Sequence, residues 1–238
     1  MRSTLNDRLH FLIYAYFGVD DTSDDIFEHI YNYDTPNNVN DDLPDSLIHL
    51  AAKKAYGDLK RRVPYVLNAT EMERSTSVTL KNMKEDFKSD VYSHLIEQLR
   101  GFEHQDTDLC ELIRSVSAIG DNYPGLFKPN HRFTIGLSQK WVNMTLKYLW
   151  ILGVIDGENL HVPIDSYIIK AATSTDNNLC LGIDYNYQNN RKSSWSSWDD
   201  IDEYSNFQMR IRNEIANRYP FSPIKWENDA WIEIANLY

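Results

Sequence analysis

The sequence predicts a mostly α-helical protein, and two observations support this fold class. Apolar residues recur at intervals of three and four in most segments, which is the spacing of one helix face. Segments that alternate apolar and polar residues are few, and no internal repeat is visible. With 238 residues, 42% of them hydrophobic, the chain is long enough to build a core around an interior pocket.

The N-terminal part of the chain contains three expected helices. Apolar residues at helical spacing mark an amphipathic helix over residues 2–17. Residues 19–44 are rich in Asp and Asn, so we expect loop and acidic surface there, around a short helix near 26–31. Asp45 can cap a further helix that runs to about residue 62.

The remaining helices follow from the same pattern. Long helices are expected at residues 78–102 and 106–119, and the second has a clear apolar face. Two proline-containing turns in residues 120–132 predict a loop. Later helices are expected at 138–152, from 164 or 165 to 172, at 199–218 and at 226–235, with a polar loop at 173–194.

Several classes of protein are excluded by what the sequence lacks. The two cysteines, Cys110 and Cys180, stand in no disulfide-rich or zinc-binding spacing. No paired histidine spacing, phosphate-binding loop or dinucleotide-binding glycine pattern is present, so we expect no metal and no cofactor. No apolar run approaches the roughly 20 residues of a membrane span, and no signal peptide is recognisable. We therefore expect a cytoplasmic protein without a membrane partner.

The net charge of −11 argues at first against a nucleic-acid partner, because Lys and Arg supply non-specific affinity for phosphates. The acidity is concentrated, however. Residues 1–50 contain 2 basic and 10 acidic side chains, whereas residues 51–100 contain 10 basic and 7 acidic ones. A DNA partner thus stays compatible with the composition, with weak background binding and a shallow dependence on salt.

Lys140 stands just inside the start of an apolar helix. The tight entry from Ile135 to Ser138 predicts backbone N–H groups that point outward and attract an anion such as phosphate. The positive helix end and neighbours such as Trp141 disfavour a cation at Lys140, which suits an amine that acts as a nucleophile. The alternatives are that Ser138 is an ordinary N-cap and that Lys140 is a surface lysine.

The second segment with chemical content is residues 161–169, which lie downstream of Lys140. Pro163 fixes the backbone before a helix begins, and Asp165 falls at the N-cap, where its ionised form is stabilised. Asp165 is therefore a candidate fixed anion. The alternative is that it only caps the helix.

Together these segments resemble the helix-hairpin-helix DNA glycosylases. The hairpin of the lyase members reads Gly-hydrophobic-Gly-any-Lys, and Gly136, Leu137 and Lys140 match it. Residues 162–165, Val-Pro-Ile-Asp, are similar to the string that contains the family's aspartate. The spacing looks most like the archaeal oxidised-guanine glycosylase branch. The resemblance covers residues 131–172, and residues 219–235 are faintly similar to the end of several members.

The chain also departs from the family pattern. Ser138 replaces the second glycine of the hairpin, and no Leu-Pro precedes Gly136. The four cysteines that hold an iron–sulfur cluster in one branch are absent, so no cluster is expected.

The resemblance implies base excision from DNA. In such an enzyme a damaged or modified base is flipped into a pocket, Asp165 stabilises the cationic sugar, and Lys140 attacks the anomeric carbon to form a Schiff base that permits AP lyase cleavage. Two variants of this interpretation stay open, one in which Lys147 is the amine and one in which Asp165 activates water without lyase action. A non-catalytic helical interaction protein that retains the fold is the alternative from another class.

The resemblance also implies the site residues and the organisation of the chain. DNA contacts are expected from Gly136, Leu137, Ser138 and Gln139, and pocket contacts from Trp141, Asn143, Lys147, His161 and Trp231. Trp195 and Trp198 are further candidates for stacking on a base. We expect a single two-lobed monomer, with residues 1–44 and 195–238 in one lobe and 45–194 in the other, including the hairpin at 131–152 and the aspartate helix at 161–172. Repair and defence against modified phage DNA are both open as roles.

Overall fold

The computed structural model describes residues 45–66, 74–100, 106–152, 155–173, 179–183, 194–220 and 222–236. These residues form the α-helices α3 (Asp45–Leu59), α4 (Arg74–Leu99), α5 (Asp106–Ile119), α6 (Ile135–Ile151), α7 (Ser166–Thr173), α8 (Ile201–Arg218) and α9 (Pro223–Asn236), and the short 3₁₀ helices η2 (Gly120–Asn122) and η3 (Trp195–Ser197). Within the described ranges there is no strand, only one isolated bridge between Tyr65 and Phe127. The prediction of a mostly α fold is confirmed, and the helices expected at 2–17 and 26–31 lie outside the described residues.

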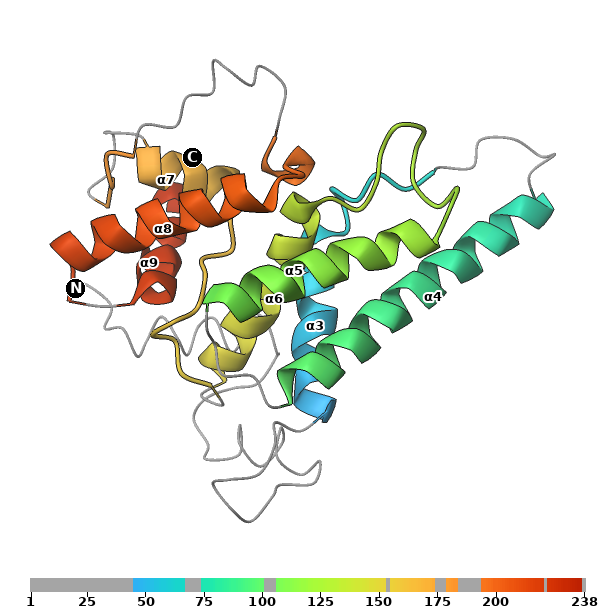
Figure 1. The fold of residues 1–238 in the computed structure, drawn as a ribbon, viewed down its shortest axis with the longest axis horizontal. Coiled ribbons are helices and arrows are strands. Elements are labelled where there is room, and N and C mark those ends of the chain that lie inside the picture. The colour runs from blue at the N-terminus through green and yellow to red at the C-terminus, as the bar shows by residue number, and fades with distance from the viewer. Residues whose placement is uncertain are drawn as a thin grey trace, which may run out of the picture.

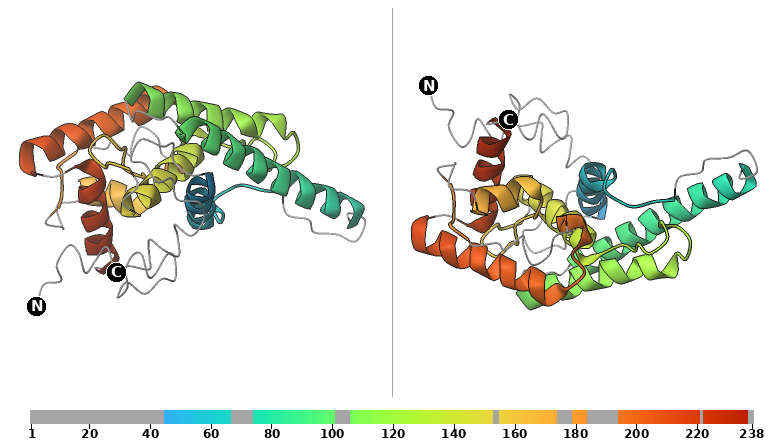
Figure 2. Two further views of the ribbon diagram at one scale, coloured as in Figure 1. Left: turned by 90° about the horizontal axis from the view of Figure 1, so that it is seen from below. Right: turned by 90° about the horizontal axis from the view of Figure 1, so that it is seen from above.

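Helix α6 is the centre of the molecule. Of its 17 residues, 16 are buried, so it has no solvent-facing stripe and is a core helix. Figures 1 and 2 show α3, α4 and α5 on one side of α6 and α7, α8 and α9 on the other. Helices α3 and α5 pack on α6 from one side, and η3 and α8 contact it from the other.

The first group of helices follows the apolar pattern of the sequence. In α3 the buried residues recur at helical spacing, and this face packs on α6. The helix ends at Leu59 rather than near residue 62, because Lys60, Arg61 and Arg62 form a turn. Helix α5 has the predicted bounds, and α4 begins four residues earlier than expected.

The second group, α7, α8 and α9, comes from the C-terminal part of the chain. Asp200 caps α8 by accepting hydrogen bonds from the N–H groups of Asp202 and Glu203. Helix α9 begins at Pro223, a favourable first position, and buries Trp226 against the chain at Leu179. Helix α7 packs against α9 across the expected boundary at residue 194, and the division into two lobes stays a prediction. None of the described helices combines the length and apolar character of a membrane span.

Candidate active site

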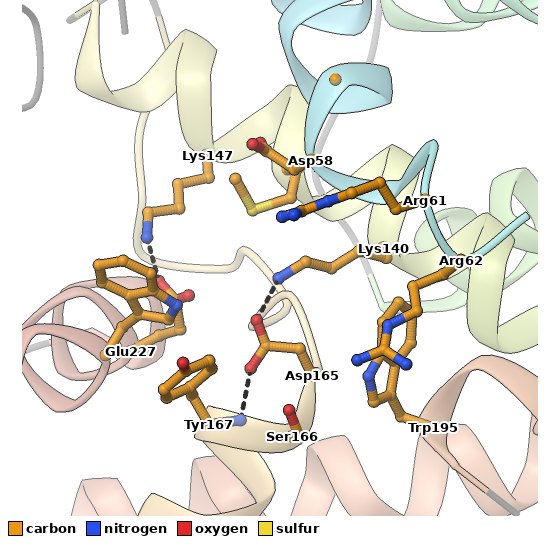
Figure 3. Close-up of a pocket in the computed structure, with 13 residues that line it drawn as sticks. Asp58, Arg61, Arg62, Lys140, Lys147, Asp165, Ser166, Tyr167, Trp195 and Glu227 are labelled. Carbon is orange, nitrogen blue, oxygen red and sulfur yellow. Dashed lines mark hydrogen bonds and ion pairs between the residues drawn. The ribbon is translucent and has the colours of Figure 1, made fainter. Parts of the chain in front are cut away.

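Lys140 lies on the second turn of α6, and its side chain points into a pocket (Figure 3). Only 6% of the residue is exposed, so it is not a surface lysine. Its Nζ donates to Oδ2 of Asp165 at 2.8 Å, which brings together two residues 25 positions apart in the sequence. The amine and the carboxylate singled out by the sequence thus face each other.

Asp165 uses its two carboxylate oxygens for different partners. Oδ1 accepts hydrogen bonds from the backbone N–H groups of Tyr167 at 2.9 Å and Ile168 at 3.0 Å, which makes Asp165 the N-cap of α7. Oδ2 is left for Lys140. Burial by itself raises the pKa of Asp165, but the charge and hydrogen bond of Lys140 and the two N–H groups outweigh it and hold the pKa below its usual value. Asp165 is therefore an anion at neutral pH.

A pair of glutamines holds the extended segment that leads to Asp165. The Gln139 side chain donates to the carbonyl of Ile164 at 2.8 Å and accepts from its N–H at 3.1 Å. Gln208 of α8 does the same for Val162, at 2.7 and 3.1 Å. These amides replace the neighbouring strand that the segment lacks. Because Gln139 precedes Lys140, the same turn of α6 positions both the amine and the carboxylate.

A second buried ion pair lies two turns further along α6. Lys147 donates to Glu227 of α9 at 2.6 Å, and the carboxylate side chain is only 1% exposed. Burial raises the pKa of Glu227 above its usual value, although the charges of Lys147 and Lys140 oppose this shift. Lys140 and Lys147 are seven residues apart, so both project from one face of α6.

The two ion pairs line one pocket with a volume of about 260 Å³. Its walls come from the C-terminal end of α3, from α6, α7 and α9, and from η3. In Figure 3, Tyr167 and Trp195 lie on either side of Asp165, and Arg61 and Arg62 reach in from the turn after α3. The lining residues are Gly57, Asp58, Arg61, Arg62, Lys140, Met144, Lys147, Asp165, Ser166, Tyr167, Trp195, Glu227 and Trp231.

The predicted pocket positions of Trp141, Asn143 and His161 are wrong. Trp141 is fully buried and donates to the carbonyl of Ala52 at 2.9 Å. Asn143 and His161 both contact the hydroxyl of Tyr204, at 2.9 and 2.7 Å, in the core. The pocket face of α6 repeats at positions i, i+4 and i+7 from Lys140, and the residues at i+1 and i+3 point elsewhere.

The expected outward-facing turn at Gly136, Leu137, Ser138 and Gln139 is also wrong in its geometry. The helix begins at Ile135, and its cap is Thr134, whose hydroxyl accepts from the N–H of Leu137 at 3.2 Å. The N–H groups of Ile135, Gly136 and Ser138 donate to Asp199 Oδ1 at 3.3 Å, to the Trp198 carbonyl at 2.8 Å and to the Thr134 carbonyl at 2.9 Å, respectively. These N–H groups are therefore not available to a phosphate.

Tertiary contacts explain why serine stands at position 138 and glycine at position 136. The Ser138 hydroxyl donates to the carbonyl of Ile113 in α5, and the residue is fully buried. A Cβ on Gly136 would lie 1.9 Å from the carbonyl oxygen of Trp195. Glycine is thus required because η3 packs directly on the first turn of α6.

Several lining residues were missed from the sequence. Asp58, Arg61, Arg62 and Glu227 lie on α3, on the turn after it, and on α9, which the chain brings to α6 from a distance. The spacing of Glu227 and Trp231, four residues apart on one helix face, is a signal that could have linked them. Of the tryptophans considered for stacking, Trp195 and Trp231 line the pocket, whereas Trp198 is buried outside it.

Searches against protein families, curated proteins and solved structures found no match to this chain. The helix-hairpin-helix family thus stays a prediction. Among the described residues, no group of three or more His, Cys, Asp or Glu side chains could hold a metal ion.

Proposed function

We propose that this protein is a DNA N-glycosylase that excises a damaged or modified base, with Lys140 as nucleophile and Asp165 as the fixed anion. The observation that carries the proposal is the 2.8 Å contact between these two groups on the wall of a pocket. Burying an ion pair costs desolvation free energy that an apolar pair avoids, so stability alone is a weak reason for it. An amine beside a carboxylate in an aromatic pocket suits attack on a sugar carbon.

The proposed reaction needs few groups. The Lys140 ammonium gives a proton to the departing base as the N-glycosidic bond breaks with its electron pair on that base, and the amine so formed bonds to the anomeric carbon. A second proton of the bonded nitrogen passes to the ring oxygen when the sugar ring opens. Asp165, whose pKa is held low, stays ionised and stabilises the cationic character of the sugar in the transition state. The sugar ring then opens to give a Schiff base, which allows strand cleavage.

The pocket suits a nucleotide flipped out of the duplex. Tyr167, Trp195 and Trp231 offer ring faces for stacking, which is worth about 1–3 kcal/mol per base in comparable sites. Arg61 and Arg62 line the pocket near Lys140 and can pair with flanking phosphates (Figure 3). Lys147 and Glu227, which pair with each other, add a polar section to the pocket wall.

Borohydride trapping tests the nucleophile. Incubation of the protein with DNA that contains an abasic site, in the presence of borohydride, should give a covalent adduct. We expect the adduct to be lost in Lys140→Ala and kept in Lys147→Ala and in Lys53→Ala, which alters an exposed lysine of α3 outside the pocket. Loss in Lys147→Ala alone would reassign the nucleophile to Lys147.

Base release tests the reaction itself. Duplexes with oxidised guanine, an alkylated base or a heavily modified base of viral DNA should be incubated with the protein and with Asp165→Asn. We expect release of at least one base, abolished in the variant. Release that survives in Lys140→Ala without any adduct would indicate a monofunctional enzyme in which Asp165 activates water. No release and no adduct from the native chain would rule out the glycosylase and favour a non-catalytic interaction protein.

A further inference from the structure

A second cavity of about 500 Å³ lies beside the turn that follows α3. Its charged lining residues are all basic: Lys60, Arg61, Lys81, Lys84 and Lys128. No acidic side chain of the described residues lines it, although the whole chain has a net charge of −11. We call these five side chains and the cavity between them the basic groove.

Aromatic stacking and backbone hydrogen bonds join the two loops that line the basic groove. Tyr65 stacks on Phe127 with ring centroids 5.7 Å apart, and Lys84 Nζ lies 4.5 Å from the centre of the Tyr65 ring. Backbone hydrogen bonds from Lys128 to Pro64 at 2.8 Å and from Val66 to Leu126 at 3.0 Å join the two loops. Lys81 and Lys84, three residues apart on α4, face the same side. The cations are thus gathered from three separate segments.

Within the described part of the chain, these cations lack the carboxylate partners that other basic residues have. Lys88, Arg100 and Arg114 pair with Glu85, Asp45 and Glu111, respectively. None of the five basic side chains of the groove makes an ion pair with any residue in the described ranges. Like charges brought together without counter-ions repel each other, so the groove is arranged for an anionic partner rather than for stability.

The basic groove adjoins the candidate active site. Arg61 lines both cavities, and Arg62, the next residue, lines the active-site pocket. The first turn of α6 cannot supply the phosphate contacts that the sequence suggested, since its N–H groups have protein partners. The groove offers basic side chains beside the pocket, and it shares Arg61 with it.

We propose that the basic groove binds the sugar–phosphate backbone of the DNA strand whose flipped base enters the pocket. This proposal rests on the proposed glycosylase function and adds where the substrate is held. Each phosphate neutralised by Lys or Arg releases counter-ions, so binding through the groove weakens as salt rises. The contacts are to the backbone, and the affinity they provide is independent of base sequence.

The test measures binding rather than chemistry. Fluorescence anisotropy of a labelled, undamaged duplex should be titrated with the full chain over a range of KCl concentrations. Lys81→Gln and Lys128→Gln each remove one exposed cation of the groove, and Lys53→Gln is the matched control from α3 outside both cavities. We expect each groove variant to lower the slope of log K against log[KCl] by about 0.9, the double variant by about twice that, and the control by nothing.

The results separate this proposal from the proposed function. Unchanged affinity and slope in the double variant, with native thermal unfolding, would overturn the groove even if the protein releases a base. Reduced affinity and slope in the groove variants, without base release or adduct from the native chain, would support the groove and leave the glycosylase rejected. An equal loss in Lys53→Gln would show general charge attraction instead of a groove, and would also overturn it.

Discussion

At Asp165 one carboxylate performs a structural and an electrostatic task on separate oxygens. Oδ1 caps α7, and Oδ2 pairs with Lys140. Asparagine can still accept the two capping hydrogen bonds, because it is as good an N-cap as aspartate. Asp165→Asn therefore removes the charge and leaves the cap, whereas Asp165→Ala removes both.

The pH dependence of the free energy of unfolding should show how much the negative charge of Asp165 stabilises the folded protein. Its folded-state pKa lies below the unfolded value of 3.8, so its contribution is fully present above pH 3.8 and is lost as pH falls through the folded pKa. We expect Asp165→Asn to cost about 3–5 kcal/mol at neutral pH, since a buried Lys140 loses its partner, and progressively less below pH 3.8. Urea unfolding at a series of pH values measures this difference.

The control for this series is Asp202→Asn, which alters an exposed acid in the first turn of α8. It should give a small difference from the native protein at every pH. A difference for Asp165→Asn that stays constant through the acid range would show that the carboxylate charge does not stabilise the folded protein.

At the scale of helices, the close contact between η3 and the first turn of α6 places Trp195 in the pocket wall. Gly136→Ala would place a Cβ 1.9 Å from the Trp195 carbonyl oxygen, so η3 must move. A Cβ on Gly57, in α3, would meet no atom within 4 Å, so Gly57→Ala serves as the control. We expect Gly136→Ala to destabilise the fold by about 1–3 kcal/mol and Gly57→Ala to stabilise it by about 0.5–1 kcal/mol. Thermal and urea unfolding of both variants measure this, and equal effects would contradict the close approach.

The helices can be predicted well from the sequence, and their ends less well, because tertiary contacts decide which residue caps a helix. Periodicity alone locates α5 correctly, because its amphipathic face is continuous from end to end. Serine is a good cap, so the sequence favours a start of α6 at Ser138, but Ser138 is bonded to α5 and Thr134 caps the helix instead. A choice between two capping residues depends on tertiary contacts that the sequence does not display.

The part of the candidate site that stands in short sequence motifs can be predicted from the sequence. The part that only long-range packing brings to the pocket is missed. Lys140 and Asp165 stand in such motifs, and the structure brings them together. Glu227 and Asp58 reach the pocket only through the packing of α9 and α3 on α6. The prediction for Trp141 is wrong because an aromatic residue next to a candidate nucleophile on a helix points about a quarter-turn away from it.

At the scale of the whole molecule, charge is distributed unevenly. Acidic residues dominate positions 1–50, whereas the described surface near the pocket has the basic groove. A negatively charged protein repels DNA at long range, and a local cluster of cations attracts it at short range. The shallow salt dependence expected from the composition and the slope expected from a few groove contacts are therefore compatible, provided that only these few phosphates are neutralised.

The burial of α6 on all sides also predicts how the molecule unfolds. Helices α3 and α5 cover one side of α6, and η3 and α8 contact the other, so neither group of helices retains a complete core without α6 and its opposite neighbours. We expect one cooperative transition in urea, in which Trp141 beside α3 and Trp226 of α9 lose their native environment at the same denaturant concentration. Fluorine-labelled tryptophan, with resonances assigned from Trp141→Phe and Trp226→Phe, reports each site separately. Earlier loss of the Trp226 signal would show that α9 and its neighbours form a less stable unit, and that the pocket opens before the rest of the protein unfolds.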